Sequence, residues 1–430
     1  MTTQAISAQT KSSLVPMVIV AMLFFILGFA TWLNGSLMPY LKQVLQLTPF
    51  QASLILFSFY IAVTFTAIPS AWVIRKVGYK TGMALGMGGM MMAGFLFIPA
   101  AKTQIFGLFL FAQLVMGAGQ TLLQTAVNPY VVRIGPEESA AVRVSIMGIL
   151  NKGAGVVAPI VFTALILSNF KYGVDTELTA TQIDEMANGL VLPYIGMAIF
   201  IGVLALAVYF SPLPELSKEE DEGNDSNRVK EALAHPKLAL GVVAIFVYVA
   251  VEVIAADTIG TFALSLGIEN YAVMTSYTMV CMVLGYVLGI LTIPKFISQP
   301  TALMISAILG VLLTLTILVI NTESTVLSDA LLVPFGGAQL PDALLLIAVL
   351  GLANAIVWPA VWPLALSGLG NLTSTGSALL VMGIAGGAFG PLFWGLLSGV
   401  SSMQIGYSVM LPCYLFIYYY AAKGHKKNEW

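Results

Sequence analysis

Residues 238–264 read LALGVVAIFVYVAVEVIAADTIGTFAL and decide the fold, because the stretch is apolar except for Glu252, Asp257 and two threonines. A helix of about 20 apolar residues crosses a hydrocarbon core ~30 Å thick, so this stretch is long enough to span a membrane. In the whole chain 59% of residues are hydrophobic and 9% are charged, whereas about a quarter are charged in soluble proteins. The composition therefore indicates a polytopic membrane protein.

Counting such stretches predicts twelve transmembrane helices. They lie at 17–40, 50–74, 81–99, 106–131, 144–167, 191–210, 238–264, 271–294, 301–320, 343–367, 372–397 and 404–422. Strands are not expected, because an open strand leaves its backbone unsatisfied in lipid and the alternating pattern of a membrane β-barrel is absent. The fold class predicted is an all-α polytopic membrane protein.

Positive charges are distributed unevenly between the two sets of helix ends. One set carries Arg75, Lys76, Lys80, Arg133, Arg143, Lys218, Arg228, Lys230, Lys237, Lys295, Lys423, Lys426 and Lys427. The other set carries only Lys42, Lys102 and Lys171. Because cytoplasmic loops are enriched in Lys and Arg, both termini are predicted to be cytoplasmic.

A hydrophilic segment with an acidic run at 219–222 divides the spans six and six. We predict a cytoplasmic tail at 1–16, a six-helix bundle at 17–210, a cytoplasmic linker at 211–237, a second bundle at 238–422 and a tail at 423–430. Gly155 and Pro159 in the first bundle match Gly387 and Pro391 in the second. Two related halves are typical of transporters that bind substrate near the membrane midplane.

Several runs of residues resemble a known family. Residues 71–80 (AWVIRKVGYK) and 135–143 (GPEESAAVR) resemble the cytoplasmic loops of the major facilitator superfamily. Residues 47–52 (LTPFQA), 124–130 (QTAVNPY) and 246–253 (FVYVAVEV) resemble the fucose–galactose–glucose permease family, in particular its glucose/galactose-type branch. The resemblance covers the whole chain and implies the major facilitator fold, in which twelve transmembrane helices form two six-helix pseudo-symmetric bundles.

The resemblance also has a gap. The fucose–proton symporter branch keeps a carboxylate in span one and another in span four, and these positions align here with Gly35 and Gln124. Neither residue can ionise. If this chain couples sugar to an ion, the comparison implies that the coupling group lies elsewhere.

Lys152, Glu252 and Asp257 are the charged residues inside the predicted spans. A charge at the bilayer centre costs roughly 2.5–3.5 kcal/mol and usually marks a functional site. Glu252 and Asp257 are five residues apart, and therefore point to different sides of a regular helix. We predict that all three are ion-coupling or gating groups, the alternative being a static ion pair or hydrogen bond between helices.

Asp257 is the residue predicted to bind a cation. Thr258 and Thr261 follow it on a helix expected to loosen at Gly260, and an acid with hydroxyls and freed carbonyls supplies the oxygens that sodium needs. Thr261 is therefore grouped with the coupling residues. Proton binding at Asp257 and simple packing remain alternatives.

A sugar site needs amides for hydroxyl groups and an aromatic plate for the apolar ring face. The predicted substrate-binding residues are Asn34, Gln120, Gln124, Asn128, Asn151, Asn354 and Trp358. An amide in a membrane helix also serves as interhelical glue, which is the alternative for each. Pro359 and Pro363, beside Trp358, are expected to kink their helix and free carbonyls that polar groups must satisfy.

The sequence therefore predicts a monomeric bacterial inner-membrane transporter that imports a neutral hexose or hexose derivative, of glucose, galactose or N-acetylglucosamine type, on a sodium or proton gradient. No cofactor beyond the co-transported cation and no nucleic-acid partner is expected. An enzyme is disfavoured, because the spans hold no paired histidines, acid dyad or serine–histidine arrangement. A passive uniporter, an exporter of an unrelated compound and a sugar sensor remain open alternatives.

Overall fold

The computed structural model describes residues 2–133, 140–167, 178–215, 225–293, 295–369, 372–427 and 429. The first half of the chain forms α1 (Thr2–Trp32), α2 (Asn34–Val44), α3 (Pro49–Val77), α4 (Tyr79–Thr103), α5 (Phe106–Arg133), α6 (Ala140–Leu165), α7 (Ala180–Gly189) and α8 (Val191–Phe210). The second half forms α10 (Pro236–Asp257), α11 (Ile259–Ser265), α12 (Met274–Thr292), α13 (Gln299–Val319), α14 (Val326–Leu331), α15 (Asp342–Ala355), α16 (Val357–Leu366), α17 (Thr373–Met382), α18 (Gly386–Val400), α19 (Met403–Gly406) and α20 (Met410–Ala422). Short 3₁₀ turns occur at Tyr271–Val273 (η3), Val333–Phe335, Gly383–Ala385 (η6), Tyr407–Val409 and Gly424–Lys426.

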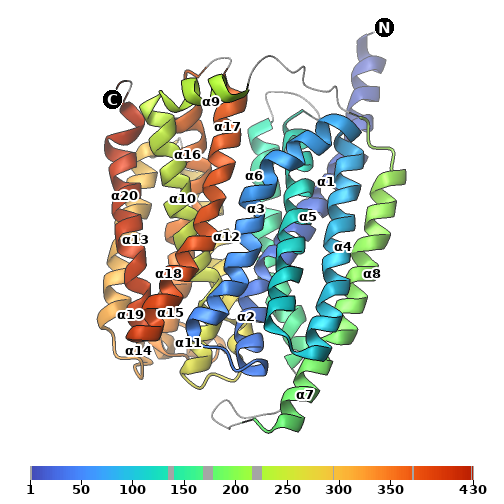
Figure 1. Cartoon of the computed structure of the whole chain (residues 1–430). Coiled ribbons are helices and arrows are strands. Elements are labelled where there is room, and N and C mark those ends of the chain that lie inside the picture. The colour runs from blue at the N-terminus through green and yellow to red at the C-terminus, as the bar shows by residue number, and fades with distance from the viewer. Residues whose placement is uncertain are drawn as a thin grey trace.

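Within the described residues, twelve helical stretches are long and apolar enough to cross a membrane, which confirms the predicted fold class. Both termini lie at the same end of the molecule, called here the terminal end (Figure 1). Helix α9 (Asp225–Leu233) lies at that end and belongs to the predicted linker, whose acidic run falls outside the described residues. The first helix begins at Thr2 and so extends back through the segment predicted as a tail.

Several spans are made of two helices rather than one, among them the first, sixth, seventh, tenth and eleventh. In the tenth span the break falls at Ile356, between α15 and α16. Proline has no N–H to donate, so Pro363 leaves the carbonyl of Pro359 without its helical partner. The Gln299 side chain donates to that carbonyl at 3.1 Å. The expected polar compensation for a proline kink is confirmed here.

The turn between α3 and α4 depends on a glycine. Gly78 has φ +87°, a left-handed conformation that side chains with a Cβ rarely adopt. The amide of Tyr79, at the start of α4, donates to the Glu215 carboxylate at 2.5 Å. Lys80 also donates to the carbonyl of Ser211 at 2.8 Å. These two hydrogen bonds hold the loop between α3 and α4 against the segment that follows α8. The Glu215 carboxylate at the N-terminus of α4 also interacts favourably with the helix dipole.

The two halves pack through a small set of helices. Helix α3 contacts α18, α6 contacts α12, and α2 contacts α11 and η3. Hydrogen bonds join the halves at the end opposite the termini, where Ser36 Oγ donates to the Ala272 carbonyl at 2.6 Å and Tyr271 OH donates to Gln43 Oε1 at 3.0 Å. Figure 1 shows α2 and α11 side by side at this end. The halves are therefore closed against each other there.

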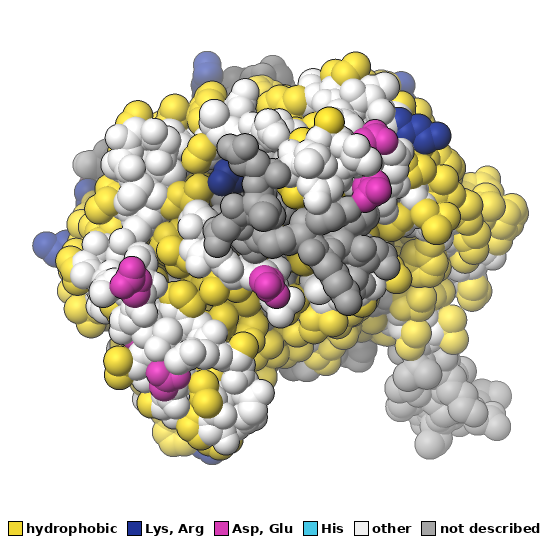
Figure 2. All heavy atoms as spheres, turned by 90° about the horizontal axis from the view of Figure 1, so that it is seen from below, with side chains coloured by type: hydrophobic (Ala, Val, Ile, Leu, Met, Phe, Trp, Pro, Cys, Tyr) yellow, Lys and Arg dark blue, Asp and Glu magenta, His cyan; other side chains and the backbone are white. Residues whose placement is uncertain are grey.

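The molecular surface agrees with a position in the bilayer. Figure 2 looks on to the end opposite the termini and shows hydrophobic side chains around the rim, with a few scattered charges on the end face. Large exposed apolar side chains on the outer helices include Phe65, Phe95, Phe200, Leu312 and Leu415. Such a belt is the surface expected of helices in contact with lipid.

Candidate functional site

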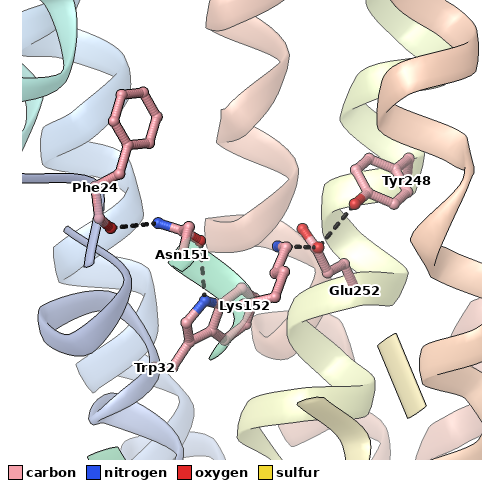
Figure 3. Close-up of polar contacts among 6 residues, drawn as sticks. All are labelled: Phe24, Trp32, Asn151, Lys152, Tyr248 and Glu252. Atoms are coloured by element: carbon pink, nitrogen blue, oxygen red, sulfur yellow. Dashed lines mark hydrogen bonds and ion pairs between the residues drawn. The ribbon is translucent and has the colours of Figure 1, made fainter. Parts of the chain in front are cut away.

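A buried ion pair joins the two halves inside the membrane. Lys152 of α6 and Glu252 of α10 lie with Nζ and Oε1 2.5 Å apart, and their side chains are 10% and 8% exposed. Figure 3 shows the two side chains pointing toward one another from their separate helices. Removing two charges from water is expensive, and their mutual attraction offsets this cost only at close range. The pair therefore links the bundles as long as the two charges stay in contact, and it becomes costly when they separate.

Aromatic groups surround the pair on both sides. Tyr248, one turn before Glu252 on α10, donates its hydroxyl to Glu252 Oε1 at 2.7 Å. From the other half, the indole ring of Trp32 lies beneath the Lys152 ammonium, with Nζ 4.4 Å from a ring centroid. A cation over an indole face is stabilised by about 0.5–2 kcal/mol, the higher value applying away from water. Each charge thus has a second partner within its own half.

Asn151 extends this polar chain toward α1. Its Oδ1 accepts a hydrogen bond from Trp32 Nε1 at 3.3 Å, and its Nδ2 donates to the carbonyl of Phe24 at 3.4 Å (Figure 3). The side chain is half-buried, and both contacts are near the upper limit of hydrogen-bond length. The amide is therefore able to exchange these contacts for a polar ligand at little cost.

Trp358 lies near Tyr248, the residue that donates to Glu252. Its ring centroid is 6.2 Å from that of Tyr248 and 5.4 Å from that of Trp362. Both tryptophans are half-buried on α16, the short helix that follows the break in the tenth span. The break positions an apolar ring face near the hydroxyl that holds Glu252.

The predicted amides fall into two groups. Asn34 accepts from Gln113 at 2.8 Å, Gln120 donates to Thr31 at 2.5 Å, and Asn354 accepts from Tyr414 at 2.8 Å. Each of these bonds stays within one bundle, as in the glue interpretation. By contrast, Gln124 and Asn128 are half-buried on α5. These two and Asn151 are the predicted amides whose side chains are partly accessible.

Asp257 lies apart from the ion pair. It is fully buried at the last residue of α10, and neither carboxylate oxygen has a hydrogen-bond partner. The hydroxyl oxygen of Thr261, also fully buried, is likewise unpartnered. The structure therefore separates the two carboxylates, pairing Lys152 with Glu252 and leaving Asp257 beside the break.

Tyr248 and Thr275 were not among the residues predicted for the site. A signal for Tyr248 was present, since it precedes Glu252 by four residues and so shares a helix face with it. Thr275, on α12, approaches Asp257 only through packing of separate spans, so nothing local in the sequence identifies it. Among the described residues, no group of three or more His, Cys, Asp or Glu side chains is placed to hold a metal ion.

Comparison with known proteins places this arrangement in a family. A sequence model described as Major Facilitator Superfamily matches residues 20–391. The chain belongs to the major facilitator superfamily. Within it, the protein is 33% identical to a putative glucose/galactose transporter of Helicobacter pylori, over 95% of this chain and 96% of that protein. It is 31% identical to a glucose/galactose transporter of Brucella abortus, over 94% and 93% of the two chains.

Solved structures agree on the architecture. The crystal structure of the Escherichia coli fucose:proton symporter superposes with a TM-score of 0.69 at 24% identity, covering 95% of this chain and 98% of that one. The protein is a member of the fucose–galactose–glucose permease family, a transporter and not an enzyme. Its spans and its bacterial relatives make it a multi-pass inner-membrane protein.

Proposed function

We propose that this transporter imports a neutral hexose or hexose derivative, of glucose, galactose or N-acetylglucosamine type, and that a sodium or proton gradient drives the import. The curated relatives named as glucose/galactose transporters support the substrate class. The observation that carries the proposal is the buried Lys152–Glu252 pair between the halves, which is in contact with Trp32 and Tyr248 and is linked through Trp32 to the partly accessible Asn151. A transporter keeps such a costly pair where the halves must separate and rejoin.

The proposed sugar site lies between α5, α6, α10 and α16. Gln124, Asn128 and Asn151 offer amide groups to the sugar hydroxyls, and Trp358 offers a plate to the apolar ring face. The other three amides are proposed to hold the helices around the site in place through hydrogen bonds within each bundle. They are Asn34, Gln120 and Asn354. This division suits recognition of a neutral sugar, because amides bind hydroxyls as donors and acceptors at once.

The ion pair is proposed to act as the gate at the level of the sugar. When Lys152 and Glu252 separate, Trp32 still faces the ammonium and Tyr248 still donates to the carboxylate. Each half is thereby able to hold its own charge while the pair is open. The free energy that is still lost when Lys152 and Glu252 separate must then be supplied by sugar binding. This requirement couples sugar binding to movement of the halves.

The terminal end is proposed to face the cytoplasm and the opposite end the periplasm, following the distribution of Lys and Arg. The structure is then closed on the periplasmic side, where Ser36 and Tyr271 bridge the halves. We propose that the protein works as a monomer and needs no cofactor other than the co-transported cation.

Uptake into proteoliposomes tests the function. Labelled glucose, galactose and N-acetylglucosamine are supplied separately, with a sodium gradient and a pH gradient imposed one at a time. We expect accumulation of one of these sugars above its external concentration under one of the gradients. Uptake that only reaches equilibrium would identify a uniporter, and saturable sugar binding without any uptake would identify a sensor.

Trp358→Ala tests the proposed sugar plate. Contact with an aromatic ring contributes about 0.5–1.5 kcal/mol beyond its buried area, so the half-saturating sugar concentration is expected to rise roughly tenfold. Trp358→Phe retains a ring and is expected to recover most of the affinity. An unchanged concentration dependence in the alanine variant, measured by initial uptake rates, would remove Trp358 from the sugar site.

A further inference from the structure

The break in the seventh span frees backbone carbonyls, and threonine hydroxyls satisfy them. Thr275 of α12 donates to the Ala256 carbonyl at 2.8 Å, and Thr278 donates to the Ala255 carbonyl at 3.3 Å. Thr258, at the break itself, donates its hydroxyl to the Ile254 carbonyl at 2.6 Å and contacts the Tyr407 hydroxyl at 3.0 Å, although that carbonyl also accepts from the Thr258 N–H at 3.2 Å. A buried backbone oxygen needs a partner in lipid, so the Thr275 and Thr278 hydroxyls stabilise the break.

Two side chains at the same break are left without partners. Asp257 is 0% exposed with both carboxylate oxygens unpaired, and Thr261 is 0% exposed with its hydroxyl unpaired. The charged groups that act on Asp257 are Glu252 and Lys152, which neutralise one another. An unpaired buried carboxylate is strongly disfavoured, so Asp257 requires a positive partner to remain ionised.

Gly35 of α2, in the other half, shows how closely these oxygens gather. A Cβ added to Gly35 would lie 2.3 Å from Thr275 Oγ1, 2.8 Å from Asp257 Oδ1 and 3.1 Å from the Ala256 carbonyl oxygen. The Gly35 carbonyl in turn lies against Gly260, the residue before Thr261. The oxygens of carboxylate, hydroxyl and carbonyl groups thus converge where the first and seventh spans meet.

We propose that Asp257, Thr261 and Thr275, with the Ala256 carbonyl, form a binding site for one sodium ion that Gly35 seals from the periplasmic side. A single carboxylate balances one monovalent charge, and hydroxyl and carbonyl oxygens are the additional ligands that a hard cation prefers. A proton would need only the carboxylate. The proposal rests on the cation-driven import proposed above and names its ion and its site.

The position of the seal explains how the site would couple to transport. Next to Gly35, Ser36 bonds to Ala272, which lies in the turn η3 just before α12. When the halves separate at the periplasmic end, Gly35 withdraws and Asp257 becomes accessible from outside. Sodium would therefore enter in the outward-open state, and its bound charge would favour closure over the site.

Sodium binding without sugar is the direct test. The purified full-length protein is unfolded thermally in sodium chloride and in potassium chloride at equal ionic strength and pH, and binding of radioactive sodium is measured by scintillation proximity. We expect the wild type to bind sodium with a rise in melting temperature that grows with sodium concentration, as linkage requires. Asp257→Asn keeps the side-chain shape and is expected to abolish both signals.

Two threonine variants separate ligation from stability. Thr261→Val removes one proposed ligand at constant shape and is expected to raise the half-saturating sodium concentration roughly tenfold, the equivalent of ~1.4 kcal/mol. Thr314→Val is the matched control. The Thr314 hydroxyl is also buried, but it lies on α13, outside the proposed site, and donates to the Gly310 carbonyl on the same helix. Its sodium binding is expected to equal that of the wild type.

The sodium site would be overturned by a folded wild type that binds no sodium, or by Asp257→Asn that binds it normally. Concentrative sugar uptake driven by a pH gradient, with sodium inert, would also overturn the site while leaving cation-driven import intact. Conversely, sodium binding that needs Asp257, together with uptake that never exceeds equilibrium, would support the site and overturn the proposed active transport.

Discussion

Lys152→Met is expected to destabilise the protein and to abolish concentrative uptake. Methionine fills a similar volume but leaves Glu252 buried without its cation, with Tyr248 as its remaining hydrogen-bond partner. Removing one partner of a buried ion pair costs about 3–5 kcal/mol, which corresponds to a ~100-fold or larger loss in the population of the closed state. Uptake into proteoliposomes and the thermal unfolding midpoint measure the two effects.

Two further variants distinguish a gate from a passive brace. Lys152→Met/Glu252→Gln removes both charges, and such replacement is often neutral or stabilising, so the unfolding midpoint is expected to recover while uptake does not. Lys295→Met is the matched control, because the exposed Lys295 also lies over an aromatic ring, that of Phe296. Full uptake by the double variant would show that the pair only braces the halves.

The span pattern was predictable from sequence because it depends on local apolar length. All twelve spans follow from that rule, and the intramembrane positions of Lys152, Glu252 and Asp257 follow with them. The pairing of Lys152 with Glu252 did not follow, since it depends on the depth at which α6 and α10 pack across the two halves. Helical rise separates Glu252 from Asp257 by about 7.5 Å along α10, but it does not tell how far α6 is displaced along α10.

The break in the seventh span shows a second limit of sequence reasoning. A break was expected near Gly260, and one is present two residues earlier, since α10 ends at Asp257 and α11 begins at Ile259. The position is set by Thr275 and Thr278 on α12, whose hydroxyls hold the freed carbonyls. Local propensity therefore predicted the break, whereas its hydrogen-bond donors come from another span, which a single sequence does not connect.

The amides illustrate the same limit in the sugar site. Six amides within spans were predicted to bind substrate, with interhelical glue as the alternative for each. Asn34, Gln120 and Asn354 make hydrogen bonds inside their bundles, whereas Gln124 and Asn128 remain partly accessible. Residue type is alike in the two groups. Only the identity of the neighbouring side chain distinguishes them, and that depends on how the helices are rotated.

Gly35→Ala is expected to reduce transport by about tenfold or more while leaving the protein folded. The added Cβ would lie 2.3 Å from Thr275 Oγ1 and 2.8 Å from Asp257 Oδ1, both in the opposite half, so closure of the halves at the periplasmic end is blocked. The contacts of Gly35 within its own half are unaffected by this clash. Two halves that fail to close at one end cannot complete alternating access, so we expect uptake to fall by about tenfold or more.

An engineered cysteine at Ala272 reports the state of the periplasmic end directly. Ala272 is fully buried beneath Ser36, so a membrane-impermeant maleimide should label Ala272→Cys slowly in the closed state, in a background with Cys281 and Cys413 replaced by serine. Gly35→Ala is expected to accelerate this labelling. Gly196→Ala is the control, because a Cβ at Gly196 meets open space. Unchanged labelling with normal uptake in Gly35→Ala would mean that the periplasmic end closes despite the added Cβ, and Gly35 would then have no role in sealing Asp257.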